Sequence, residues 1–339
     1  MVKSGVATIK DIARSASLTP AAVSMILNGK GKFKESTVKT VQRIARDLRY
    51  VANASASGLV KRQTRLIGFL VPSMAEPFTV EILRGLEERL HHFGYDLVLY
   101  NTIGNEDHLE TLYQRIAGAR RVDGIVVQMF SHTERQMKAY MSHLLPCVLI
   151  EGEAASIDSI TVDNYAGAFA ATEYLIRKNR KRILFICGEL LTNVMIDRKR
   201  GFLDAMKKHA IRTPKSLMFE INYENSRMRQ KGMEIIEHFD LTKPLPFDAA
   251  FCAAGDEVAA GMIRDLLDHR YRVPQDVAVV GFDDQPIAQI VSPSLTTVRQ
   301  PIREMGATAI NFIINRLQSA AIKPQHKVFK AELIIRDST

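Results

Sequence analysis

Polar, charged and aromatic side chains stand at or just after the ends of many apolar runs in this chain. Glu151 lies in the run PCVLIEG, Asp256 follows AAFCAAG, and Asp283 follows DVAVVGF. Carboxylates accept hydrogen bonds from hydroxyl groups, and an arginine such as Arg198 donates several. These residue types therefore predict a site for a small polar molecule, with aromatic rings able to stack on it. The candidate set is Ser73, Phe78, Gln128, Glu151, Arg198, Tyr223, Asp256 and Asp283.

Each candidate also has a structural interpretation, and the sequence leaves both open. Asp163 and Asp256 follow strand-like runs, where an acid is often a helix N-cap. Phe78 and Tyr223 could be core residues. Arg198 belongs to the charged stretch Asp197-Arg198-Lys199-Arg200, which could be a solvated surface.

The elements that must position these residues are short apolar runs that alternate with amphipathic helical stretches. The runs lie at 66–72, 95–102, 123–130, 146–152, 159–163, 182–188, 217–223, 249–255 and 276–282. Near-continuous apolar runs suit parallel strands buried on both faces. The alternation occurs twice, which predicts two doubly wound parallel sheets with a cleft between them. Ligands of such sheets bind outside the carboxyl ends of the strands.

Motifs for catalysis and metal binding are absent. The chain has no GxGxxG after its first strand-like run, no GxxxxGK[ST], no GxSxG and no HExxH, and its nine histidines show no metal spacing. Cys147, Cys187 and Cys252 form no CxxC pair and lie in or beside apolar runs, so we expect small buried side chains. We predict no catalytic residue, no cofactor and no metal.

The basic charge is confined to the first fifth of the chain. Residues 1–65 hold thirteen Lys or Arg and three acidic residues, a net +10, so the remaining 274 residues sum to −1 of the total +9. A basic segment joined to a near-neutral body is typical of a module that binds a polyanion.

Two short helices and a third, basic helix are predicted in this segment. Thr8 with Asp11 resembles a helix start, and Thr19-Pro20 marks a second start because Pro suits the first helical turn. A third helix is expected from about Ser36 to Leu48. This order is that of a helix-turn-helix, whose second helix enters the major groove, although a plain three-helix bundle is the alternative. The outward positions of the second helix are Pro20, Ala21, Ser24 and Met25.

Residues 8–59, TIKDIARSASLTPAAVSMILNG and then DLRYVANASASGL, resemble the start of a LacI/GalR-family regulator. The resemblance implies a headpiece, a hinge helix that orders on DNA, and a periplasmic-binding-protein-like sensor. The hinge match is 53–59, and Leu59 falls where the family inserts an apolar wedge into the minor groove. The implied DNA-binding residues are Thr8, Thr19, Pro20, Ala21, Ser24, Met25, Asn28, Lys34, Asn53, Ala56 and Leu59.

The chain departs from the family pattern at three positions. Ala22 and Met25 stand where the family often has threonine and a basic residue, and loss of the basic residue removes a common contact to guanine. Gly58 replaces a bulkier hinge residue, and glycine costs about 1 kcal/mol in a helix relative to alanine. We therefore expect either an altered operator half-site or a specificity that depends more on DNA shape, and we expect a less readily ordered hinge.

The resemblance also assigns motifs in the body. Arg198 matches R-x-x-G-[FW], Asp256 matches the acid before A-x-G, and Asp283 matches G-[FY]-D-[DN], with Asp284 expected to be structural. Tyr223 and Phe78 fall where the family has aromatic residues near its ligand. The implied domains are 1–50 (all-α headpiece), 51–65 (hinge) and 66–339 (α/β sensor). The sensor's N-lobe is expected at about 66–163 and 297–326, and its C-lobe at about 164–296 and 327–339.

The resemblance implies a sequence-specific DNA-binding transcription regulator, expected to be a repressor. Its implied partners are double-stranded operator DNA, a small effector and a second copy in a homodimer, with no coiled-coil tail for tetramers. A sugar is the favoured effector, and the alternatives are a purine or nucleobase effector or a solute-binding protein. No run of about 18 apolar residues and no signal-peptide pattern is present, so no membrane and a cytoplasmic location are expected.

Overall fold

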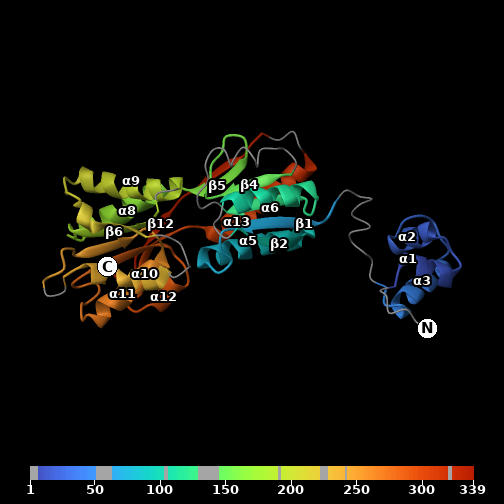
Figure 1. The fold of residues 1–339 in the computed structure, drawn as a ribbon, viewed down its shortest axis with the longest axis horizontal. Helices are drawn as coiled ribbons and strands as arrows, with labels where there is room; N and C mark the ends of the chain where they lie inside the picture. The colour runs from blue at the N-terminus through green and yellow to red at the C-terminus, as the bar shows by residue number, and fades with distance from the viewer. Residues whose placement is uncertain are drawn as a thin grey trace. The chain divides into compact units, whose positions relative to one another are not determined.

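The computed structural model describes residues 7–50, 63–102, 106–128, 145–189, 192–221, 228–240, 243–319 and 323–339. The chain forms two compact units, Met1–Thr64 and Arg65–Thr339 (Figure 1). The described residues of the first unit form three helices, and those of the second form two six-stranded sheets covered by helices.

The first unit consists of α1 (Ile9–Ala16), α2 (Pro20–Leu27) and α3 (Glu35–Asp47). The backbone N–H of Thr8 donates to the Asp11 carboxylate at 3.0 Å and the Thr8 hydroxyl donates to it at 2.6 Å, so this pair begins α1. Thr19 begins α2, where its hydroxyl oxygen accepts from the backbone N–H of Ala22 at 3.2 Å. Both predicted helix starts are confirmed. The small core is formed by Ile12, Ala13, Val23, Ile26, Val41 and Ala45.

The first lobe of the second unit is built on a parallel sheet of order β11-β5-β4-β3-β1-β2. Its strands are β1 (Leu66–Val71), β2 (Asp96–Asn101), β3 (Gly124–Gln128), β4 (Cys147–Ile150), β5 (Asp158–Val162) and β11 (His326–Phe329). Helices α5 (Pro77–Phe93) and α13 (Ile302–Gln318) pack on one face, and α6 (Glu106–Gly118) packs on the other. The strand side chains alternate between these two cores, which is why the apolar runs are nearly continuous.

The second lobe repeats this architecture with the order β12-β10-β9-β8-β6-β7. Its strands are β6 (Ile183–Gly188), β7 (Met218–Ile221), β8 (Ala249–Cys252), β9 (Ala278–Asp283), β10 (Thr296–Arg299) and β12 (Glu332–Ile334). Helices α8 (Asn164–Arg177) and α9 (Asn193–Lys208) cover one face. The other face carries α10 (Met228–Glu234), α11 (Asp256–Asp268) and α12 (Ile287–Ile290), with short 3-10 helices at Lys215–Leu217 and Ile236–His238. The β10–β12 pair is antiparallel, whereas the other pairs are parallel.

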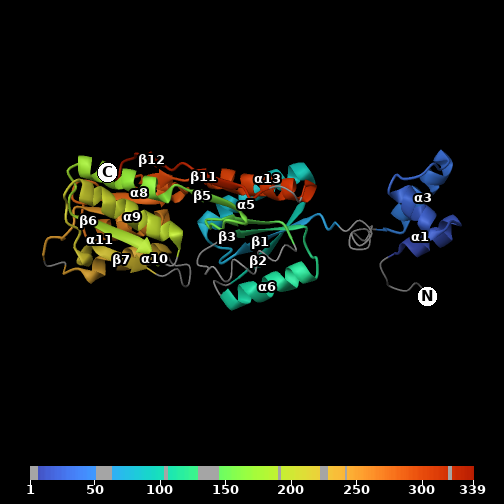
Figure 2. The ribbon, with the colours of Figure 1, turned by 90° about the horizontal axis from the view of Figure 1, so that it is seen from above.

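The lobe boundaries near the C-terminus differ from those expected. The strand 296–299 pairs with β9 and stays in the second sheet, so the chain returns to the first lobe at Gln300–Ile302 and not at 297. The residues after 326 do not form one strand of the second lobe. β11 pairs with β5 in the first sheet, and β12 then pairs with β10 in the second (Figure 2). The local pattern cannot separate these cases, because strand partners are chosen by tertiary packing.

Helices α5 and α13 pack with their backbones almost in contact. A Cβ atom added at Gly85 would lie 1.9 Å from the carbonyl oxygen of Arg303, and one added at Gly306 would lie 2.4 Å from that of Ile82. Glycine is therefore required at both positions for this close approach.

Replacing Gly85 with alanine is expected to lower the free energy of unfolding by about 1–3 kcal/mol, since the two helices must separate. Urea denaturation checks this. Gly118→Ala is the matched control, because no atom lies within 4 Å of a Cβ at Gly118 at the end of α6. The control is expected to be neutral or slightly stabilising. Equal losses in the two variants would contradict the prediction.

Candidate effector site and DNA-binding unit

The second helix of the first unit presents the predicted outward residues. Pro20, Ala21 and Met25 are exposed and Ser24 is half-buried, whereas Val23 and Ile26 are buried in the core. Of the other DNA-binding candidates, Thr8, Thr19, Asn28 and Lys34 are also exposed. Asn53, Ala56 and Leu59 lie outside the described residues.

Arg198 projects from α9 into the second lobe, where only 3% of it is exposed. Its Nε donates to Asn164 Oδ1 and its Nη1 donates to the carbonyl of Ala253, both at 2.8 Å. The guanidinium stacks on Phe282 at 3.6 Å from the ring centroid, and Nη2 lies 3.8 Å from a carboxylate oxygen of Asp283. These contacts exclude the alternative that Arg198 belongs to a charged stretch exposed to solvent.

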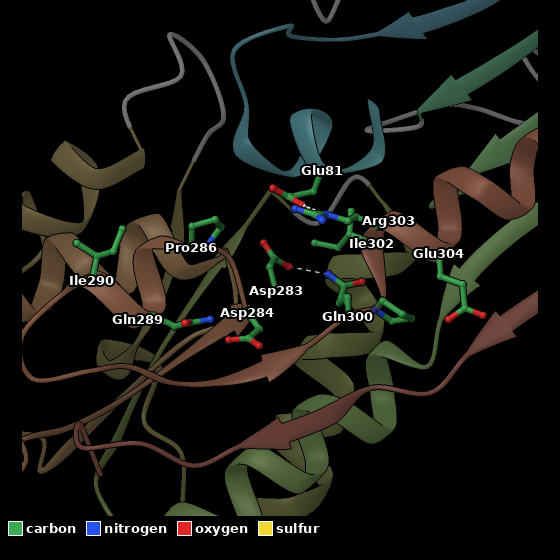
Figure 3. Close-up of a pocket in the computed structure, with 11 residues that line it drawn as sticks. Glu81, Asp283, Asp284, Pro286, Gln289, Ile290, Gln300, Ile302, Arg303 and Glu304 are labelled. Atoms are coloured by element: carbon green, nitrogen blue, oxygen red, sulfur yellow. Dashed lines mark hydrogen bonds and ion pairs between the residues drawn. The ribbon is translucent and has the colours of Figure 1, made fainter. Parts of the chain in front are cut away.

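Asp283 ends β9 and is held by two glutamine side chains. Its carboxylate accepts from Gln285 Nε2 at 3.2 Å. It also accepts from Gln300 Nε2 at 2.6 Å (Figure 3). Its backbone φ of 108° is rare for a residue other than glycine, so tertiary contacts must hold it there. Burial raises the pKa of Asp283 to about 6, and the positive charge of Arg198 opposes that rise.

Glu151 contributes a carboxylate from the first lobe. It directly follows β4, has a left-handed backbone with φ of 60°, and is half-buried. Desolvation raises its pKa to about 8, with Arg198 lowering it and Asp283 raising it further. Glu151 therefore senses two charges of the opposite lobe. The structure thus places Glu151 near Arg198 and Asp283, and their joint role in binding a ligand stays a prediction.

The raised pKa of Glu151 predicts a pH dependence of stability. The folded chain keeps this proton to higher pH than the unfolded chain, where the usual value is 4.5. The contribution of Glu151 to the free energy of unfolding is therefore fully present below pH 4.5 and is lost as the pH rises through about 8. Asp283 acts in the same direction up to about pH 6. We expect Glu151→Gln to flatten the decline between about pH 6 and 8.

Urea denaturation at pH 5, 6, 7 and 8 measures this slope. Glu153→Gln is a useful control, because Glu153 lies two residues away, is exposed, and accepts from the Thr161 hydroxyl at 3.5 Å. If the free energy of unfolding changes equally with pH in Glu151→Gln and in the unaltered protein, Glu151 does not hold the predicted proton.

Gln128 ends β3 and is almost fully buried. Its Oε1 accepts from the Thr79 hydroxyl at 2.9 Å, and its Nε2 has no hydrogen-bond partner among the described residues. A buried amide donor without a partner is costly, which is consistent with a group that awaits a ligand or water.

Asp256 is not placed to bind a ligand as expected. It is fully buried at the start of α11, where one oxygen accepts from the Gln285 backbone N–H at 2.7 Å and the other from the Thr297 hydroxyl at 2.5 Å. A Cβ at Gly281 would lie 2.2 Å from its Oδ1, so protein surrounds the carboxylate. Burial and then Asp283 hold the pKa of Asp256 well above its usual value. Asp256 instead positions the loop that carries Gln285 and Asp283, and the cap of α11 is Gly255.

Of the three other candidates, two make contacts within the first lobe and one lies outside the described residues. Phe78 packs in the core of the first lobe, the alternative interpretation of this ring. Ser73 accepts from the Ala75 backbone N–H at 3.3 Å in the turn before α5. Tyr223 lies outside the described residues.

Two further acids make structural contacts: Asp163, for which the sequence left a helix cap and a ligand contact open, and Asp284, which was expected to be structural. The Asp163 side chain caps α8 by accepting from the Ala166 backbone N–H at 2.9 Å. Asp284 pairs with Arg299 and Arg336, each at 2.6 Å. The cysteines are buried as expected.

An open pocket of about 600 Å³ lies where the two lobes meet (Figure 3). Asp283 and Gln300 reach it from the second lobe and the crossover. Glu81 and Arg303, joined by a 2.7 Å ion pair, line it from the first lobe. Gln300, Gln285 and Glu81 were not among the predicted site residues, because none of them directly ends an apolar run.

Within the described ranges, no three His, Cys, Asp or Glu side chains gather as a metal site requires. None of the described helices combines the length and apolarity needed to cross a bilayer.

Comparison with known proteins finds a family model within each of the two units. Residues 8–53 match the model for bacterial regulatory proteins of the lacI family, and residues 172–339 match that for a periplasmic-binding-protein-like domain. The HTH-type transcriptional regulator RegA of Clostridium saccharobutylicum is 34% identical over 336 residues, which cover 98% of this chain and 99% of RegA. The chain belongs to the LacI family.

Two other proteins of the family are similar to this chain in sequence or in fold along nearly its full length. The ribose operon repressor of Escherichia coli K12 is 33% identical over 344 residues, 98% of this chain and 99% of that repressor. The solved Lac repressor dimer bound to operator and the anti-inducer ONPF has a TM-score of 0.85 at 21% identity, covering 99% of each chain, and shows the same fold. This LacI-family protein is a DNA-binding transcription regulator with a headpiece and a two-lobed sensor for a small ligand.

Proposed function

We propose that this LacI-family protein is a repressor that binds a pseudo-palindromic operator as a homodimer and responds to a sugar or sugar derivative. One observation carries the choice of ligand. Carboxylates from both lobes, Glu151 and Asp283, lie within electrostatic reach of one ordered guanidinium, that of Arg198.

Neighbouring hydroxyls of a sugar need both donors and acceptors in fixed positions. Arg198 supplies donors, and Asp283 and Glu151 supply acceptors, each from a different element. The side-chain nitrogen of Gln128, which has no hydrogen-bond partner among the described residues, adds a donor from the first lobe. The relatedness to a ribose operon repressor supports the same ligand class.

Control of DNA binding follows from linkage. A ligand held by both lobes favours one relative arrangement of the lobes. It changes operator affinity only if it binds more tightly to one of two conformations that differ in their affinity for the operator. Typical coupling is about 1–3 kcal/mol, or roughly 5- to 150-fold in affinity. We further propose that the protein acts in the cytoplasm, where its DNA is accessible, and that it catalyses no reaction.

Selection of bound sequences from a random DNA pool tests the DNA part of this proposal. The full chain is compared with residues 65–339 at about 150 mM salt, which suppresses phosphate-only binding. Enrichment of a two-fold-symmetric motif by the full chain alone is expected. The same motif from both proteins, or no motif under any condition, would refute the proposal.

The selected operator then reports the effector. Operator affinity is measured with ribose, other pentoses, hexoses, and the purines hypoxanthine and guanine. A shift of 5-fold or more with a sugar is expected. A response to purines alone would replace the sugar proposal with the nucleobase alternative.

A further inference from the structure

The outer face of α2 has few polar groups free to read a base. The helix PAAVSMIL contains no charged residue. Asn28 at its end donates to the Ser24 carbonyl at 2.7 Å, and the Thr19 hydroxyl oxygen accepts from the backbone N–H of Ala22. The amide and hydroxyl that flank this helix are therefore engaged within the unit, and Ser24 is half-buried.

Met25 is the largest outward side chain of α2, with 43% of it exposed. A Cβ added at Gly31 would lie 2.9 Å from the Met25 Cε and 2.9 Å from the Phe33 ring. The Met25 methyl group thus rests beside the loop that follows α2. This support limits the motion of the thioether and leaves its other side open. Ala21, one turn earlier, is also exposed, so the two side chains form an apolar strip along the helix.

The chemistry of this strip matches one feature of the major groove. Guanine is read mainly by Arg or Lys, and adenine by Asn or Gln, whereas the 5-methyl group of thymine is read by apolar contact. We propose that Met25, with Ala21, recognises thymine methyl groups in each half-site and thereby sets the operator sequence. This inference rests on the proposed function, because it requires α2 to enter the major groove.

The charged residues near α2 are suited to contact phosphates and not bases. Lys30, Lys32 and Lys34 are exposed and follow the helix. Lysines at such positions neutralise phosphates, and phosphate contacts place the protein without reading sequence. Base discrimination is therefore left largely to the apolar strip. The Arg or Lys contact to guanine that Met25 cannot make is replaced by a weaker contact to thymine.

The test removes single methyl groups from the selected operator. Each thymine in the half-site is replaced by deoxyuridine, and affinity for the full chain is measured by fluorescence anisotropy. A buried methyl contributes about 0.8 kcal/mol, or about 4-fold in affinity. We expect a 3- to 5-fold loss at one or two thymines per half-site, and Met25→Ala should abolish that difference at one of them at least.

Met74→Ala is the matched control, because Met74 is also 43% exposed but belongs to the second unit. It should keep the full deoxyuridine effect. Met25→Arg supplies a gain-of-function readout, since repeated selection with this variant should enrich guanine at the affected position.

The outcomes distinguish a failure of the thymine contact from a failure of the proposed function. A symmetric operator whose thymines all tolerate deoxyuridine would overturn the methyl contact while leaving operator binding intact. The same would follow if Met25→Ala and the unaltered protein lost equal affinity at each thymine. Absence of any selected motif would refute the proposed function and, with it, this inference.

Discussion

Replacing Arg198 with methionine is expected to lower the free energy of unfolding by about 3 kcal/mol or more. The change leaves Asn164 Oδ1 and the Ala253 carbonyl without their donor and removes the cation near Asp283. Breaking a buried ion pair by removing one partner typically costs about 3–5 kcal/mol. Because the pKa of Asp283 is already about 6, uptake of a proton by this carboxyl offsets part of the cost near neutral pH.

Arg200→Met is the matched control for this prediction. Arg200 lies two residues further along the same helix, its side chain is 60% exposed, and it pairs with Asp197 at 3.0 Å. Exposed pairs of this kind contribute about 0–1 kcal/mol. Urea denaturation of both variants gives the comparison. Similar losses for Arg198→Met and Arg200→Met would show that the buried contacts of Arg198 add no stability.

Asp283→Asn is expected to abolish the effector response while operator affinity without effector stays within about 2-fold. Asparagine keeps the shape but replaces one carboxylate oxygen with an amide donor. Gln285 and Gln300 both point their amide N–H groups at this side chain, so the new donor faces two donors unless one of these amides turns over. A coupling of roughly 5- to 150-fold should fall to less than about 2-fold.

Operator binding by the variant with and without the effector found in the screen measures this loss. Thermal unfolding, followed in parallel, shows that the variant is folded. Asp268→Asn is the control, because Asp268 lies on the surface of α11 in an i,i+4 pair with Arg264. The control should respond normally. A normal response of Asp283→Asn would remove Asp283 from the effector site.

Local signals in the sequence were sufficient for the DNA-binding unit. The starts of α1 and α2 depend on Thr8 with Asp11 and on Thr19 with Pro20, residues at most three positions apart. The third helix was expected from about Ser36 and begins at Glu35. Short-range capping and periodicity act in the same way in any tertiary setting, so sequence patterns identify them directly.

The pattern of apolar runs likewise determined that the second unit holds two largely parallel sheets. It also placed Glu151 and Asp283 among the ligand candidates, because polar residues that end buried strands meet at one edge of a sheet. The family resemblance singled out Arg198 from its charged neighbours. Its burial beside Phe282 agrees with that choice.

Only the tertiary structure decided how acids of similar sequence context are used. Asp256 and Asp283 both follow apolar runs, yet Asp256 is enclosed by Gln285 and Thr297, whereas Asp283 reaches the pocket between the lobes. The sheet assignment of β10 and β11 and the role of Gln300 were also undetermined. These outcomes depend on contacts between residues far apart in the chain, and such contacts leave no local pattern because packing and strand pairing select them together.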